Sequence, residues 1–455
     1  MKEKTMVNNM TEGSVFRHLW RFALPLLLAN CLSTLYTTVD TLVVGRFVGT
    51  AGLSAVSTCG ELITFYTMIA MGLTSGGQII IAQFVGKNDK EAISKTIGTL
   101  FSLLIVSSLV VTLFCIAALD WQLGIMNVPP EAYQEGRNYT LICGAGMIFV
   151  FGYNGVSAVM RGLGDSKRPL IFIGIASVAN LLLDLLFVCV FHWGAAGAAL
   201  ATIMGQAFSL VASVLYLYRR RESFGFDFKP RSFVPTKKYL TMLLRLGGPM
   251  AVQFAMVLIS VIFISSQINL FGVAASAANG VSTKLENIVR IVSNSVSTAA
   301  SSMIAQNIAA RKISRVNRIL GYSMVICISW ATLCSLAIFL FPQQIFSLFD
   351  SSEDVLTYAL IFVPAGVVCY MGNGIRATAN ALMNGIGYAT LSLVAGILDS
   401  VVARIGFSLL LGYVLDMGIL GFWYGSALAG YVPIVIALVY YLSGKWKTHK
   451  LITQN

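Results

Sequence analysis

Residues 22–49 have the sequence FALPLLLANCLSTLYTTVDTLVVGRFVG, a long apolar stretch that contains one proline, Pro25, and one acid, Asp40. A helix needs about 20 apolar residues to cross the hydrocarbon core of a bilayer, and this stretch is long enough. It is too long for a signal peptide and has no small-residue cleavage site. We therefore expect it to remain in the protein as the first membrane-spanning helix.

The composition of the whole chain agrees with a membrane protein. Of its 455 residues, 57% are hydrophobic and only 11% are charged, whereas soluble domains carry about 25% charged residues. So few charges cannot cover the surface of a soluble protein of this length, which excludes a soluble enzyme. The eight cysteines lie singly in apolar stretches and the three histidines lie far apart, so neither a metal site nor a Ser/His/Asp set is indicated.

Apolar stretches of sufficient length recur along the whole chain. We predict an all-α integral membrane protein with twelve transmembrane helices and no enzymatic activity. The twelve expected spans lie near residues 20–45, 53–82, 96–118, 138–160, 169–191, 195–218, 241–270, 275–304, 319–341, 355–378, 387–412 and 419–443.

The basic residues predict the orientation of these spans. The chain has 31 Lys and Arg against 19 Asp and Glu, a net charge of +12. Most of the basic residues, including Arg376 after the tenth span, fall in alternate loops on the side of the N-terminus, and cytoplasmic loops are enriched in Lys and Arg. We expect both termini to be cytoplasmic in the plasma (cell inner) membrane. The positive charge then reflects topology, and no nucleic-acid partner is expected.

The two halves of the chain resemble each other. Pro25 corresponds to Pro249, Ser57-Thr58-x-x-Glu61 to Ser282-Thr283-x-x-Glu286, and Gly162-x-Gly164 to Gly385-x-Gly387, with nearly constant spacing. We predict two pseudo-symmetric six-helix lobes, residues 1–218 and 241–455, joined by a cytoplasmic interlobe linker at 219–240. Parallel repeats of this kind enclose a cavity near the membrane midplane. No P-loop motif is present, so an ion gradient or the substrate's own gradient must supply the energy.

Four polar residues of the N-terminal half are expected to converge inside the membrane. A charged residue within a span costs at least about 2.5–3.5 kcal/mol. At about 1.5 Å per residue, Asp40 lies about 9 Å from the outer end of its span, and Asp184 and Thr202 lie about 12 Å from theirs. Asn180 shares a helix face with Asp184. These groups suit a Na⁺ site or a shared proton; the alternative is that they only form hydrogen bonds between helices.

The remaining acids have plainer explanations. Glu286 has Arg290 four residues later, an arrangement typical of an ion pair within a helix, although a substrate or proton role stays open. Asp399 can pair with Arg404. Glu61 corresponds to Glu286 in the repeat, which suggests a repeated structural role. The roles of Glu61, Glu286 and Asp399 are left open at this point.

The chain resembles the multidrug and toxic compound extrusion (MATE) family, specifically its DinF-like branch. The resemblance rests on the stretch around Pro25 and Asp40, on AQFVGKND at 82–89, on RGLGDSKRPL at 161–170 and on NLLLD at 180–184. It implies secondary active export of cationic amphipathic compounds in exchange for Na⁺ or H⁺ by alternating access, without a cofactor. Carried over from that branch, the coupling residues are Asp40, Asn180, Asp184 and Thr202, and Pro25 is the bend of the first helix.

Substrate contacts are predicted less directly. Drug and coupling cation are expected to compete for one negatively charged pocket, and we predict that Tyr36, Asn154 and Glu286 line the substrate cavity. We expect the protein to act as a monomer in the bilayer. The alternative function is a flippase for lipid-linked saccharides of the wider superfamily, although those proteins commonly have additional spans and a basic central cavity. The residues do not choose between Na⁺ and H⁺.

Overall fold

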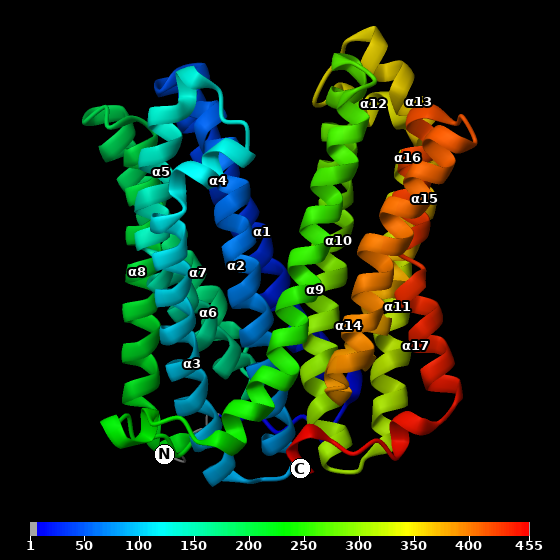
Figure 1. Cartoon of the computed structure of the whole chain (residues 1–455). Helices are drawn as coiled ribbons and strands as arrows, with labels where there is room; N and C mark the ends of the chain where they lie inside the picture. Colours follow the sequence, from blue (N-terminus) through cyan, green and yellow to red (C-terminus); the bar gives the residue numbers. More distant parts are fainter. Residues whose placement is uncertain (1–6, 455) are drawn as a thin grey trace. The chain divides into compact units, whose positions relative to one another are not determined.

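The computed structural model describes residues 7–454 and is almost entirely helical, with no strand in that range (Figure 1). The described residues form two compact units. The first unit comprises residues 7–9 and Leu24–Ala251, and the second comprises Met10–Ala23 and residues 252–454. Each unit is described separately below.

The division between the units falls inside two long helices, α1 (Val15–Phe47) and α9 (Lys237–Asn269). The beginning of α1 packs with the second unit, and α9 as far as Ala251 packs with the first. Pro25 and Pro249 lie within three residues of these points. A proline removes one backbone hydrogen bond from a helix, so both helices are locally weakened where their packing partner changes. The units therefore differ from the predicted lobes at 10–23, which belong to the second unit, and at 241–251, which belong to the first.

The helices of the first unit pack as neighbours in a bundle. Contacts join α7 to α8, and α2 to both α5 and α6. The fourth expected span, 138–160, is a bent pair, with an angle of 47° between the residues before and after Gly146. The elements are α2 (Gly49–Gly86), α3 (Lys90–Ala117), α4 (Leu119–Ile125), η1 (Pro130–Ala132), α5 (Tyr133–Ala145), α6 (Met147–Gly162), α7 (Lys167–Asp184), η2 (Leu185–Val190), α8 (Gly194–Arg219), η3 (Arg221–Ser223) and η4 (Pro230–Phe233).

Two of the sequence motifs form the starts of helices. In AQFVGKND, Asp89 accepts a hydrogen bond from the backbone N–H of Ala92 at 2.9 Å and caps α3. In RGLGDSKRPL, Gly164 adopts a φ of +87°, which favours glycine. Asp165 then accepts from the backbone N–H of Lys167 at 3.1 Å and pairs with the Arg168 guanidinium at 2.8 Å. Asp89 is thus the N-cap of α3, and Asp165, directly before the N-cap residue Ser166, holds the first turn of α7.

The second unit has the same general organisation. Its closest packing joins α10 to α13 and α11 to α13. Its elements after α9 are α10 (Val273–Ala309), α11 (Ile313–Leu340), α12 (Pro342–Ser347), α13 (Glu353–Ile386), α14 (Ala389–Ile397), η5 (Leu398–Ile405), α15 (Gly406–Leu409), η6 (Leu410–Val414), α16 (Gly418–Ala429), α17 (Val432–Leu442), η7 (Lys445–Lys447) and η8 (Ile452–Gln454).

The described helices account for all twelve expected spans. Ten helices are long and apolar enough to cross a membrane, and the bent pair α5 and α6 makes eleven. The remaining expected span, 275–304, corresponds to α10, a continuous helix of 37 residues. It carries Lys284, Glu286 and Arg290 together with many Ser, Thr and Asn residues, so its hydropathy is lower than that of its neighbours.

The outer surfaces of the helices are apolar. On α3, Val106, Val110 and Leu113 form a stripe and are 60%, 60% and 67% exposed. A soluble protein rarely leaves such a stripe in water, whereas lipid solvates it. The protein is therefore a multi-pass membrane protein.

The segment predicted as an interlobe linker is part of the first unit. Phe224 and Phe226 are fully buried, and the Ser102 hydroxyl of α3 donates to the backbone carbonyl of Phe233. Residues 219–240 therefore connect α8 to α9 and also pack on α3, so this polar segment is more ordered than its composition indicates.

Candidate functional site

The first unit brings together the four residues predicted to converge. Asp40 lies on α1, Asn180 and Asp184 on α7, and Thr202 on α8. The side chain of Asn180 donates to the Thr202 hydroxyl at 3.4 Å. Gly205 permits this approach, because a Cβ at that position would lie 2.9 Å from the carbonyl oxygen of Ala176 on α7. The glycine in the sequence therefore allows α7 and α8 to approach each other closely where Asn180 and Thr202 lie.

The two acids of this cluster lie against each other. The carboxyl of Asp184 interacts with the carboxyl of Asp40 and with the carboxamide of Asn180. Even so, both oxygens of Asp184 and one oxygen of Asp40 are buried without a hydrogen bond of normal geometry. Asp184 is only 1% exposed. Buried polar groups are normally paired. These oxygens are therefore the acceptor positions at which the site can bind a proton or a cation.

The electrostatics of the pair follow from its surroundings. Within residues 7–454, none of the ion pairs joins a Lys or Arg to Asp40 or Asp184. Two adjacent carboxylates cannot both stay charged in a low-dielectric medium without a counter-charge. A proton or a hard cation would supply it, and the carboxylate, carboxamide and hydroxyl oxygens are the ligand types that Na⁺ accepts. The described residues contain no group of three His, Cys, Asp or Glu side chains that would hold a transition metal.

A change of helix type occurs directly at the acid on α7. Asp184 is the last residue of α7, and the chain continues as the π-helix η2. π-helical turns occur frequently at functional sites because they alter which face a side chain presents. The expected span 169–191 is therefore continuous, but its last third is wound as a π-helix.

The residues predicted to line the substrate cavity lie in different surroundings. Tyr36, one turn before Asp40 on α1, interacts with the side chain of Gln206 on α8, so it belongs to the acid cluster. Asn154 on α6 donates to the backbone carbonyl of Val150 in its own helix at 2.8 Å. Sequence reasoning missed Gln206; the signal that could have found it is its position four residues after Thr202, on the same face of α8.

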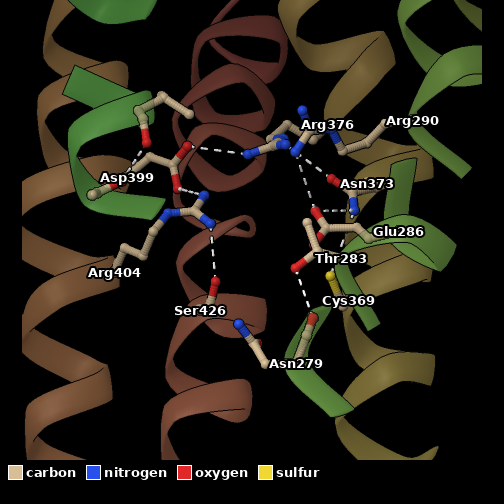
Figure 2. Close-up of polar contacts among 12 residues, drawn as sticks. Asn279, Thr283, Glu286, Arg290, Cys369, Asn373, Arg376, Asp399, Arg404 and Ser426 are labelled. Atoms are coloured by element: carbon tan, nitrogen blue, oxygen red, sulfur yellow. Dashed lines mark hydrogen bonds and ion pairs between the residues drawn. The ribbon is translucent and has the colours of Figure 1, made fainter. Parts of the chain in front are cut away.

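Glu286 belongs to a network of charged side chains in the second unit (Figure 2). The predicted pairs are confirmed, with Glu286 3.7 Å from Arg290 and Asp399 3.1 Å from Arg404. Arg376 of α13 links them, because its guanidinium lies 3.2 Å from Asp399 and donates to the Asn373 side chain at 2.9 Å. Asn373 in turn donates to Glu286 at 3.2 Å.

One sequence prediction about this region was wrong. Arg376 is not a loop residue, because α13 continues to Ile386 and the Arg376 side chain is only 18% exposed. Glu61, the repeat counterpart of Glu286, lies exposed on α2. The correspondence in sequence therefore does not extend to the environment of the two acids. A hydropathy profile alone places Arg376 outside the span, because one charge near the end of a long apolar helix resembles a helix boundary.

Comparison with known proteins agrees with this architecture. The family model MatE matches the chain twice, at residues 25–186 and 249–410. The two matches are equal in length and begin at Pro25 and Pro249, which supports the internal repeat inferred from the sequence. A protein named probable multidrug resistance protein YpnP, from Bacillus subtilis (strain 168), is 27% identical over 447 residues, 98% of this chain and 99% of that protein. The probable multidrug resistance protein NorM of Thermotoga maritima is 21% identical over 96% of this chain and 95% of its own length.

Solved structures show the same fold. A MOP superfamily transporter from Pyrococcus furiosus, described as having a binding pocket of reversed polarity, superimposes with a TM-score of 0.90 at 22% identity, over 99% of this chain and 100% of that one. A MATE protein crystallised in complex with MaD3S also reaches 0.90, at 21% identity and the same coverage. The twofold family match extends over well more than half of the residues. The chain therefore belongs to the MatE (MATE) family and is a membrane transporter, not an enzyme.

Proposed function

We propose that this transporter exports cationic amphipathic compounds in exchange for Na⁺ or H⁺, with Asp40, Asn180, Asp184 and Thr202 as the coupling site. The observation that carries the proposal is the adjacent pair of acids, of whose four carboxyl oxygens three are buried without a hydrogen bond and none has a basic partner. The names of the relatives, which describe probable multidrug resistance proteins, agree with it.

Coupling follows from competition for the acids. A ligand drives a conformational equilibrium only through its different affinities for the two states. A cationic substrate and the coupling cation both neutralise the Asp40 and Asp184 pair, so they exclude each other. Entry of the coupling cation from outside would release the substrate there, and the neutralised pair would permit return. Pro25, inside α1 and fifteen residues before Asp40, is the proposed bend that couples the two steps.

Transport from proteoliposomes tests the proposal. Ethidium efflux is measured with Na⁺ and pH gradients imposed separately, which also identifies the coupling ion. We expect Asp40→Asn and Asp184→Asn to lower gradient-driven efflux by about tenfold or more, as expected for loss of a charge worth more than 1.4 kcal/mol. Asp120→Asn is the matched control, because Asp120 lies in the same unit but its side chain is 70% exposed. Wild-type ion dependence in Asp40→Asn and Asp184→Asn vesicles would disprove the coupling role.

A further inference from the structure

The segment that joins α8 to α9 presents a row of basic side chains that the coupling mechanism does not use. Between Arg219 and Lys238 the chain carries seven Lys and Arg residues against two acids, a net charge of +5. The segment continues from the lower end of α8 in Figure 1 and belongs wholly to the first unit. Its exposed basic residues, called the basic face below, are Arg219, Arg220, Lys229, Arg231, Lys237 and Lys238.

The aromatic residues of the segment hold the basic face in place. Phe226 is fully buried, and its ring lies 5.3 Å from that of Phe233 and 6.4 Å from that of Phe101 on α3. The backbone also approaches α3 closely, because a Cβ on Gly98 would lie 1.8 Å from the carbonyl oxygen of Ser232. The aromatic side chains thus pack on the bundle while the basic side chains stay exposed. A flexible linker would fix neither.

Most of the positive charge of the basic face is unpaired. Lys229 pairs with Asp227 at 3.7 Å, and Asp227 also accepts a hydrogen bond from the backbone N–H of Lys229 at 3.2 Å. The other five residues of the basic face form no ion pair in the part of the chain that the structure describes. Like charges gathered on one surface repel one another, so an anionic partner would stabilise this face.

The basic face adjoins apolar surface that lipid covers. On α8, an exposed apolar stripe passes through Val211 and Leu215 and ends at Tyr218, directly before the basic face. Tyrosine is enriched at the level of the lipid headgroups. The guanidinium of Arg221 lies 4.5 Å from the centre of the Tyr218 ring. The basic face therefore begins where the hydrocarbon-facing surface of α8 ends, which is the depth of the lipid phosphates.

We propose that the basic face binds the phosphate groups of anionic phospholipids in the adjacent leaflet. Its charge favours an anion, and its continuity with apolar surface favours a lipid over a soluble anion. The orientation of the spans requires basic residues in this loop but does not require that they be held on a folded face. The proposal concerns the lipid partner of the protein and does not rest on the coupling mechanism.

Lipid titration of the purified full-length protein, measured by native mass spectrometry, tests this face. The probes are dioleoyl phosphatidylglycerol, which is anionic, and dioleoyl phosphatidylcholine, which has no net charge. We expect the wild type to bind phosphatidylglycerol about tenfold more tightly or better. Arg219→Gln/Arg220→Gln should weaken that binding by about fivefold or more, because each basic residue near anionic lipid contributes a factor of about five. Binding of phosphatidylcholine should not change.

Two further variants separate the basic face from net charge and from the fold. Arg311→Gln/Arg318→Gln removes the same charge from exposed residues of the second unit and should bind phosphatidylglycerol as the wild type does. Arg219→Lys/Arg220→Lys keeps the charge and should bind within about twofold of the wild type.

Four outcomes would each overturn the proposal. They are equal affinity of the wild type for the two lipids, equal loss of affinity in the two Gln variants, loss of binding in the Lys variant, and displacement of phosphatidylglycerol by glycerol phosphate at the same concentration. The last result would identify a site for a soluble anion.

Discussion

At the scale of single residues, the buried acids of the two units differ in whether they have basic partners. In the first unit, Asp184 and Asp40 adjoin each other with oxygens that lack hydrogen bonds. In the second unit, Asp399 is neutralised by Arg376 and Arg404. A satisfied ion pair rigidifies its surroundings, whereas an unsatisfied acid retains affinity for a ligand. The first unit is therefore the one suited to take up a cation.

The Thr202 hydroxyl provides a graded test of the coupling site. Thr202→Val keeps the shape of the side chain but removes the acceptor that Asn180 uses. We expect the half-saturating concentration of the coupling ion to rise about threefold to tenfold, the effect of losing one hydrogen bond of about 1 kcal/mol. Ion-dependent ethidium efflux from proteoliposomes measures it.

The control for Thr202 lies on the same pair of helices. Ser209 of α8 donates to the backbone carbonyl of Phe172 on α7 at 2.8 Å. Ser209→Ala should lower thermal stability by about 1 kcal/mol and leave the half-saturating ion concentration unchanged. An equal shift of that concentration in both variants would assign Thr202 a purely structural role.

At the scale of the elements, α2 and α9 pack backbone to backbone within the first unit. A Cβ on Gly72 would lie 2.2 Å from the Cα of Ala251, and one on Gly76 would lie 2.6 Å from the backbone nitrogen of Gly247. Small residues are common where helices approach this closely in membranes. Because of this contact, α9 packs with the first unit as far as Ala251, although α9 is the first helix of the second half of the chain.

Replacement of the glycines on α2 tests this packing. Gly72→Ala should lower the free energy of unfolding by about 1–3 kcal/mol, because the added methyl group overpacks a contact between backbones. Gly60→Ala on the same helix meets nothing within 4 Å and should be neutral or stabilising by up to about 1 kcal/mol. Thermal unfolding in detergent compares the two variants. Equal melting temperatures would show that α2 and α9 are not closely packed there.

At the scale of the whole molecule, the positions of the helices do not determine which side of the protein faces the cytoplasm. Basic residues predict that both termini lie in the cytoplasm. A C-terminal green fluorescent protein fusion should therefore fluoresce, and an alkaline phosphatase fusion at the same place should be inactive. A phosphatase fused after Asn127, beyond α3 and α4, should be active instead. An active phosphatase at the C-terminus would reverse the proposed orientation.

The sequence by itself determined the helices, the membrane setting and the repeat. A helix in lipid satisfies its backbone hydrogen bonds within its own segment, so span length and apolar composition are sufficient to locate it. Spacing along a helix also placed Asn180 beside Asp184 and paired Glu286 with Arg290. Only the tertiary structure decided which distant groups meet, because such contacts depend on the rotation, depth and approach of separate helices. The contact of Arg376 with Asp399 and the place of residues 10–23 in the second unit are of this kind.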